Sequence, residues 1–312
     1  MHHLPLKKNI VARLNWMGSM LLLLFIFATA PAVQAATLEE RYPGLSTSLL
    51  KSAVLAPLDD DTLLIADGVT IKRSQLLDNI KDQEPKVRIQ LERNLIFILE
   101  QQAIRQILLN EAKKAGIAVV AMDEQGAMQA LFEHQTKGLT VSAEEARAFY
   151  TANTEMMSGA AFEQVSDNIR QYLLQDKKQQ AVSKYIDGLG GSAQLRVNAK
   201  WMETHSRLAT DNPVDKARRS GKPTLVEFGA KGCIPCDMMQ PILDNLRRDY
   251  PEKLNVVFVH VGEEQILSSR FGIRSIPVQV FFDAKGKEVF RHVGFYAEKD
   301  VLAQLKKMGV EK

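Results

Sequence analysis

Cysteine is scarce in this 312-residue chain, which contains only Cys233 and Cys236. An exported protein that depends on disulfides for stability usually carries more cysteines and spreads them so that they close long loops. These two cysteines are separated by only two residues and close almost no loop. We therefore expect the pair to have a chemical role and not a structural one.

An excess of positive charge is also lacking once the beginning of the chain is set aside. The net charge of +3 comes from 40 basic and 37 acidic residues. Three of the basic residues, Lys7, Lys8 and Arg13, precede the first acidic residue, and 37 basic residues remain without them. Because nucleic-acid binding depends on neutralising phosphates with excess positive charge, we expect no nucleic-acid partner.

Long hydrophobic runs are absent beyond the first 35 residues. Those residues have the order of a signal peptide: a basic segment up to Arg13, an apolar stretch from Trp16 to Ala28, and small residues at Val33 and Ala35. We expect cleavage after Ala35 and export to the periplasm. The alternative is an uncleaved inner-membrane anchor at residues 16–30, which is disfavoured because a spanning helix needs about 20 apolar residues.

The remaining chain has the length and hydrophobic content of about two domains. Its pattern predicts an N-terminal extension at 36–60, a mainly helical domain at 61–199, a linker at 200–210 and an α/β domain at 211–312. In the helical domain, a hairpin around Asp67-Gly68 precedes one helix from Pro85 to about Ala115. A later helix starts near Phe162 and is expected to end at the glycines that begin with Gly188.

The last hundred residues alternate between strand and helix patterns. Strands are predicted at 224–228, 255–261, 278–282 and 288–292, and helices at 233–250, 264–271 and 298–308. A strand, a helix and a second strand in succession form a parallel crossover unit. The predicted fold class is therefore a mainly α domain followed by an α/β domain.

The motif Cys233-Ile234-Pro235-Cys236 follows a predicted strand and opens a predicted helix. The free N–H groups and the dipole at a helix N-terminus stabilise a thiolate, so Cys233 is the expected nucleophile. Cys236 is close enough in sequence to resolve a mixed disulfide formed by Cys233. Two alternatives remain: half of a zinc site, for which no histidine has suitable spacing, and a purely structural disulfide.

Residues 225–236, with Pro241-Ile242-Leu243 and residues 271–277, resemble the thioredoxin family. The resemblance covers about 211–312 and implies a thioredoxin fold without metal or cofactor. It implies that Pro277 follows a cis peptide bond and that Ile276 and Pro277 bind the backbone of the target. It also implies that Glu227 is a buried acid that exchanges a proton with the second thiol.

Three positions depart from the thioredoxin pattern. Gly232 replaces an aromatic residue, Ile234 replaces a glycine, and Phe258 replaces a lysine. These departures favour a dedicated partner over general thioredoxin activity. Pro235 is similar to the residue found in reducing members of the family, so we expect a reductase, with an oxidase or isomerase as the alternative.

Residues 66–71, 107–117 and 141–145 resemble the N-terminal region of SurA-type periplasmic chaperones. The resemblance implies a helical domain that binds clients or dimerises. The segment between Tyr150 and Phe162 is too short for an isomerase domain, so we expect no prolyl isomerase activity.

Together these features predict an exported thiol-disulfide oxidoreductase that reduces disulfide-containing or unfolded exported proteins. The family resemblance implies that a membrane carrier of the DsbD or CcdA type would supply the electrons. The alternative is a chaperone of the holdase type with an accessory thioredoxin domain.

Overall fold

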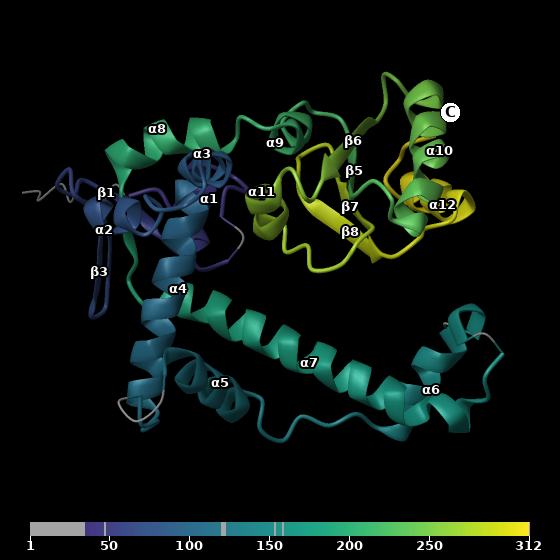
Figure 1. Cartoon of the computed structure of the whole chain (residues 1–312), viewed down its shortest axis with the longest axis horizontal. Coiled ribbons are helices and arrows are strands. Elements are labelled where there is room, and N and C mark those ends of the chain that lie inside the picture. Colours follow the sequence, from purple (N-terminus) through teal and green to yellow (C-terminus); the bar gives the residue numbers. More distant parts are fainter. Residues whose placement is uncertain (1–34, 47, 120–122, 153, 158, 312) are drawn as a thin grey trace, which may run out of the picture. The chain divides into compact units, whose positions relative to one another are not determined.

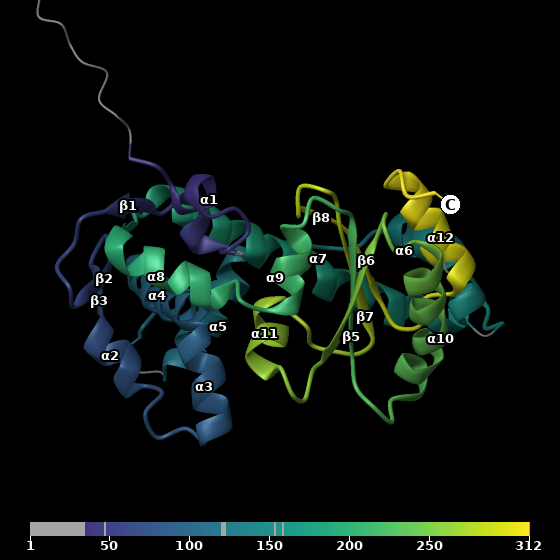
Figure 2. The same ribbon diagram turned by 90° about the horizontal axis from the view of Figure 1, so that it is seen from above.

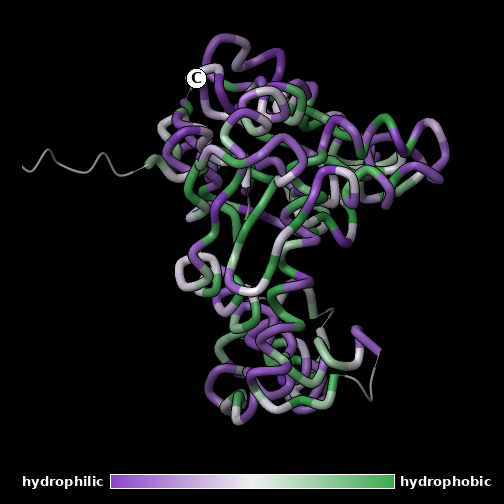
Figure 3. Tube along the Cα trace, turned by 90° about the vertical axis from the view of Figure 1, so that its left-hand side faces the viewer, coloured by the Kyte–Doolittle hydropathy of each residue, from purple (hydrophilic) through white to green (hydrophobic). Residues whose placement is uncertain are grey.

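The computed structural model describes residues 35–46, 48–119, 123–152, 154–157 and 159–311. Almost all of the predicted signal peptide, and all of the alternative anchor at 16–30, lie outside the described residues. Within the described ranges no helix is both long enough and apolar enough to cross a membrane. Figure 3 illustrates this, since hydrophilic and hydrophobic residues interleave along the coloured trace.

The N-terminal region, to the end of α8, contains helices and a small sheet (Figure 1). The helical elements are α1 (Leu38–Arg41), η1 (Leu49–Ser52), α2 (Arg73–Asp78), α3 (Pro85–Arg93), α4 (Leu95–Lys114), α5 (Glu124–Gln135), α6 (Ala143–Ala152), η2 (Thr154–Met157), α7 (Phe162–Ser192) and α8 (Ala199–Ala209). The strands are β1 (Val54–Ala56), β2 (Thr62–Ala66), β3 (Val69–Lys72) and β4 (Arg196–Asn198). Their order in the sheet is β1-β4-β2-β3.

The predicted hairpin around Asp67-Gly68 is formed by β2 and β3, which pair antiparallel. Gly68 adopts a φ of 68°, which a residue without Cβ tolerates readily. Residues 36–60 do not form a separate extension as we expected. Strand β1 pairs in parallel with β4, which lies about 140 residues later, and Leu38, Leu49 and Leu50 are buried in the core of this region.

The single helix expected from Pro85 to Ala115 is two helices, α3 and α4, separated at Asn94. The side-chain amide of Asn94 donates a hydrogen bond to the carbonyl oxygen of Gln90 at 2.9 Å. Asparagine side chains compete in this way with the backbone bonding of a helix, which explains the break. At the far end, Gly116 has a φ of 75° and Ile117 N–H bonds to Ala112 O, as in a Schellman cap.

Helix α7 continues through the glycines at which we expected it to end. A Cβ atom on Gly190 would lie 2.5 Å from the backbone oxygen of Leu49 in η1, whereas one on Gly191 would meet nothing within 4 Å. Gly190 therefore permits the close approach of α7 to η1, and packing holds the helix together against its low helix propensity.

The expected linker at 200–210 is also structured, because helix α8 covers Ala199–Ala209. Asn198 caps this helix by accepting a hydrogen bond from Trp201 N–H at 3.0 Å. Trp201 and Met202 are buried in the hydrophobic core of the N-terminal region. The polar composition of the segment reflects the exposed face of an amphipathic helix and not a flexible connection.

The C-terminal region follows as α9 (Pro213–Arg218), β5 (Thr224–Gly229), α10 (Ile234–Asp249), β6 (Asn255–His260), α11 (Gln265–Arg270), β7 (Val278–Phe282), β8 (Glu288–Val293) and α12 (Glu298–Lys307). The strand order is β6-β5-β7-β8. Strands β5 and β6 are parallel, as the crossover pattern predicted, whereas β7 is antiparallel to both β5 and β8.

Alternation along β5 directs successive side chains to opposite faces of this sheet. Leu225 belongs to a core that includes residues of α10 and α12, and Val226 belongs to a second core with residues of α9 and α11. The two helix pairs lie on opposite sides of the sheet in Figure 2. Glu227 and Gly229 have the same parity as Leu225, so they face α10.

A buried ion pair connects the two helices of the second face. Arg270 Nη1 of α11 lies 2.6 Å from Asp215 Oδ2 of α9, and both side chains are at most 4% exposed. Arg270 Nη1 also donates to the carbonyl oxygen of Ala209 at 3.1 Å. Because these buried charges have good partners, the pair fixes α9 against α11.

Candidate active site

The centre of the candidate site is a disulfide between Cys233 and Cys236, whose Cα atoms are 5.2 Å apart. Strand β5 ends at Gly229, a short loop follows, and Cys233 is the N-cap residue of α10. Pro235 lies in the first turn of the helix, where its missing N–H is tolerated. The sequence thus places a reducible sulfur pair at the start of a 16-residue helix.

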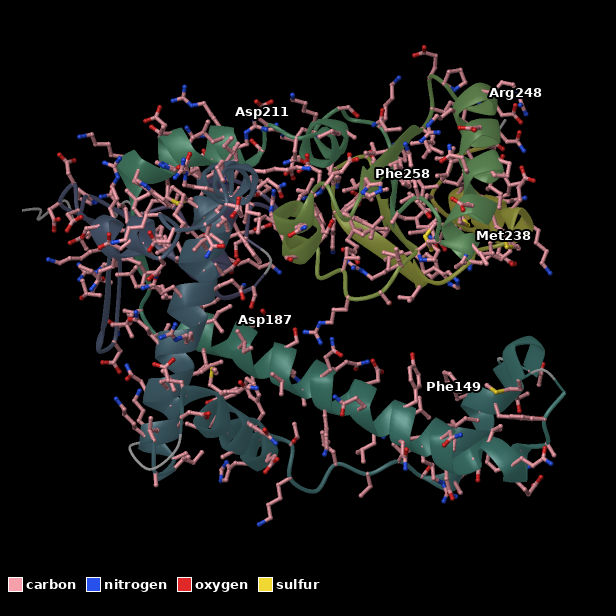
Figure 4. All side chains as sticks on the ribbon, viewed as in Figure 1. Phe149, Asp187, Asp211, Met238, Arg248 and Phe258 are labelled. Atoms are coloured by element: carbon pink, nitrogen blue, oxygen red, sulfur yellow. A yellow bond between two sulfur atoms is a disulfide. The ribbon has the colours of Figure 1, made fainter. Side chains whose placement is uncertain are left out.

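The two sulfurs have different environments. Cys233 is half-buried, whereas Cys236 is only 4% exposed. A Cβ atom built on Gly229 would lie 3.5 Å from Cys236 Sγ, so the second sulfur packs against the end of β5. Ile234 is 76% exposed, and Met238 on α10 is also exposed (Figure 4). The first sulfur is therefore the one that a large substrate can reach.

Glu227 is fully buried in β5, on the face that Cys236 also occupies. It is paired in register with Phe258 on β6 and Gln279 on β7. Gln279 Nε2 donates a hydrogen bond to Glu227 Oε2 at 2.9 Å. Burial raises the pKa of Glu227 to about 7, and the hydrogen bond from Gln279 partly opposes this rise. A carboxyl group with this pKa can exchange protons near neutral pH.

Pro277 lies at the same end of the sheet as the cysteine loop. Phe228 of β5 is opposite Val278 of β7, so the residue before Val278 lies beside Gly229, where the chain turns toward Cys233. The Ile276–Pro277 peptide bond is cis. Pro277 is buried, Ile276 is half-buried, and the Pro277 carbonyl accepts a hydrogen bond from Gly294 N–H at 2.8 Å.

Gln279 did not emerge from the sequence as a site residue. Its signal was present, because it is the only polar residue in the strand Val278–Phe282 and strands buried on both faces are usually apolar throughout. Phe258 was noted only as a replacement for a lysine. In the structure Phe258 is opposite Glu227 in register, and its Cε2 lies 3.1 Å from a Cβ built on Gly229, on the same face of the sheet.

Among the described residues, no group of three or more histidine, cysteine, aspartate or glutamate side chains is suitably placed to hold a metal ion. The sulfur pair itself can carry out thiol-disulfide exchange, and burial raises the pKa of the Glu227 carboxyl group on the same face of β5 to about 7.

Comparison with known proteins agrees with this chemistry. Residues 210–309 match the family described as "Thioredoxin-like domain". Thioredoxin of Alicyclobacillus acidocaldarius is 35% identical over 96 residues, which are 31% of this chain and 90% of that protein. Thioredoxin of Pseudomonas aeruginosa is 40% identical over 82 residues, which are 26% of this chain and 76% of that protein.

A solved structure of a mutant thioredoxin from Halobacterium salinarum is 27% identical, with a TM-score of 0.29. The matched part is 32% of this chain and 85% of the chain in that structure. The Cys-X-X-Cys disulfide and the thioredoxin relatives identify a thiol-disulfide oxidoreductase. Through its C-terminal region, this chain belongs to the thioredoxin family.

Proposed function

We propose that this chain reduces disulfides of exported proteins, with Cys233 as the nucleophile and Cys236 as the resolving thiol. The observation that carries the two cysteine roles is the asymmetry of the pair: Cys233 is the N-cap residue of α10 and is half-buried, whereas Cys236 is 4% exposed. A helix N-terminus stabilises the attacking thiolate. Because the Cys236 sulfur is buried, it reacts only with the mixed disulfide that Cys233 has formed.

The reaction has two exchange steps. The Cys233 thiolate attacks one sulfur of the client disulfide, the client S–S bond breaks, and the other client sulfur leaves as a thiolate. Cys236 then loses its proton and attacks Cys233, which releases the second client sulfur as a thiolate. The client disulfide gains two electrons and the Cys233–Cys236 pair loses two. A separate dithiol donor must then reduce the pair again.

Three further residues have proposed roles in these steps. Glu227 accepts the proton of Cys236, which its burial on the same face of β5 and its pKa of about 7 support. Ile276 and Pro277 bind the client backbone beside the cysteine loop. Their position opposite the end of β5 supports this role, because an extended client segment could lie along that edge of the site.

Two single substitutions test the cysteine roles in the full mature chain. Cys236→Ser should accumulate a mixed disulfide between Cys233 and a client, visible as a reductant-sensitive adduct on a denaturing gel. Cys233→Ser should form no such adduct, and neither variant should turn over. Equal adduct formation by both variants would contradict the assignment of nucleophile and resolving thiol.

We also propose that the protein acts in the periplasm and receives electrons from a membrane carrier of the DsbD or CcdA type. The order of charges and apolar residues in the first 35 residues supports export. Cell fractionation and N-terminal sequencing test this, and the expected mature sequence begins at Ala36. A protein that retains Met1 in the membrane fraction would favour the inner-membrane anchor.

For the N-terminal region we propose client binding or self-association, in line with its resemblance to SurA-type chaperones. The side chains assigned to client contact are Ile89 of α3, which is 52% exposed, and Tyr172 of α7, which is 59% exposed. The double variant Cys233→Ser/Cys236→Ser separates this activity from redox chemistry. If the protein is chiefly a holdase, the double variant will suppress aggregation of an unfolded client as well as the original chain does.

A further inference from the structure

The buried pair formed by Glu227 and Gln279 has two oxygen atoms without partners. Both side chains are fully buried, and the Gln279 amide occupies only Glu227 Oε2. Within the described part of the chain, Glu227 Oε1 and Gln279 Oε1 have no hydrogen-bond partner. Burying an unpaired polar atom costs free energy, so this arrangement is not explained by stability alone.

The surroundings of the pair restrict how the Glu227 carboxyl group can be oriented. Phe258 lies in register on one side and Gln279 on the other. Gly229 is the next residue of β5 on the same face, and the space above it is filled by the Phe258 ring and Cys236. Among the described residues, Gln279 thus makes the only hydrogen bond to the Glu227 carboxyl group.

Among the described residues, no charged side chain contributes to the pKa shift of the Glu227 carboxyl group. The causes that shift the pKa of Glu227 are burial and the Gln279 hydrogen bond, without a contribution from a neighbouring charge. The titratable groups that pairing and packing place around this pair include His292, which is opposite Gln279 in register and stacks on Tyr296, and His260, which is opposite Gly229. Cys236 and Asp237 are at the start of α10 on the same side of the sheet.

We propose that Gln279 is a positioning residue for proton transfer: its amide holds Glu227 by Oε2 and leaves Oε1 free to take the proton of Cys236. This inference rests on the proposed function and adds a residue to it. In the resolving step, the proton moves from Cys236 Sγ to Glu227 Oε1 while the sulfur electron pair forms the bond to Cys233. The Cys233–client bond breaks, and the client sulfur leaves as a thiolate.

The test uses the reduced mature chain and the chromogenic disulfide dithiobis-nitrobenzoate. Because the mature chain has only two cysteines, it should release two chromophores in sequence. The first reports attack by Cys233, and the second reports resolution by Cys236. The variant is Gln279→Met, which keeps a similar shape without the donor. Gln304→Met is the matched control, since Gln304 is 8% exposed and lies on α12.

The Gln279 hydrogen bond favours the ionised form of the Glu227 carboxyl group. Loss of this bond should therefore move the pH midpoint of the second phase upward by about one unit. The second phase should then be about fivefold slower near pH 7 and converge with the original rate at alkaline pH, where the thiol ionises by itself. The first phase, and both phases of Gln304→Met, should not change.

An unchanged midpoint in Gln279→Met, or a slowing by the same factor at every pH, would overturn the positioning role. If Gln279→Met does not fold, Gln279→Leu is the second variant, because leucine is apolar and similar in size at this buried position. Failure of the original chain to release a second chromophore would instead contradict the proposed function.

Discussion

The buried carboxyl group of Glu227 should make the stability of this protein depend on pH in a direction opposite to that of most carboxyl groups. Its pKa is about 7 in the folded chain, against 4.5 for an ordinary glutamate. Well below pH 4.5 it is protonated in both the folded and the unfolded chain and has no effect on stability. As pH rises toward 7, the unfolded chain releases the proton first, so the folded state loses stability.

At 1.36 kcal/mol for each unit of pKa difference, the loss between pH 4.5 and pH 8.5 is about 3 kcal/mol. Glu227→Gln removes the titration while keeping a polar side chain beside Gln279. We therefore expect the variant to gain about 3 kcal/mol relative to the original chain over that pH range. Urea unfolding of the oxidised proteins at both pH values measures this gain.

The control is Glu252→Gln, which replaces a glutamate whose side chain is 89% exposed. It should follow the pH dependence of the original chain. If the stability difference between Glu227→Gln and the original chain is the same at pH 4.5 and pH 8.5, the carboxyl group does not titrate as a buried group. The reasoning that makes it a proton acceptor near neutral pH would then be refuted.

Two further pairs of variants test the packing of the fold by urea or thermal unfolding. Gly190→Ala should cost about 1–3 kcal/mol because its Cβ would meet the backbone oxygen of Leu49, whereas Gly191→Ala should stabilise α7 by up to about 1 kcal/mol. A stabilising Gly190→Ala would refute the close approach. Asp215→Ala should cost about 3–5 kcal/mol by leaving Arg270 buried without its partner. Asp60→Ala, from an exposed ion pair, should cost less than about 1 kcal/mol, and equal costs would contradict the account.

Local patterns predicted the elements of the C-terminal region from β5 onward closely, whereas the short helix α9 was not predicted. The strand at 278–282 and the hairpin around Asp67-Gly68 have the expected positions, because alternation and turn residues act within a few neighbours. The errors arose where distant parts of the chain decide the outcome. Strand β1 pairs with β4 about 140 residues later, and Gly190 remains helical because it packs against η1. Neither contact produces a periodic pattern in the amino-acid sequence.

The sulfur pair of the site was identifiable from the sequence because Cys-X-X-Cys at a strand-to-helix junction is a strong local pattern. Burial of Glu227 agrees with the expectation drawn from the family resemblance. Gln279 could not be placed from the sequence alone, since its partner lies on another strand and the pairing depends on the register of β5 and β7. A polar residue inside an apolar strand is the clue to seek in related sequences.

The reduction potential of the Cys233–Cys236 pair tests the central claim most directly. It is measured on the mature protein by equilibration with glutathione or dithiothreitol buffers and thiol labelling. A reductase should have a potential close to that of thioredoxin, about −270 mV, and each 30 mV corresponds to about 1.4 kcal/mol for this two-electron couple. A value close to about −120 mV, as in DsbA, would contradict the claim and make the protein an oxidant of exported chains.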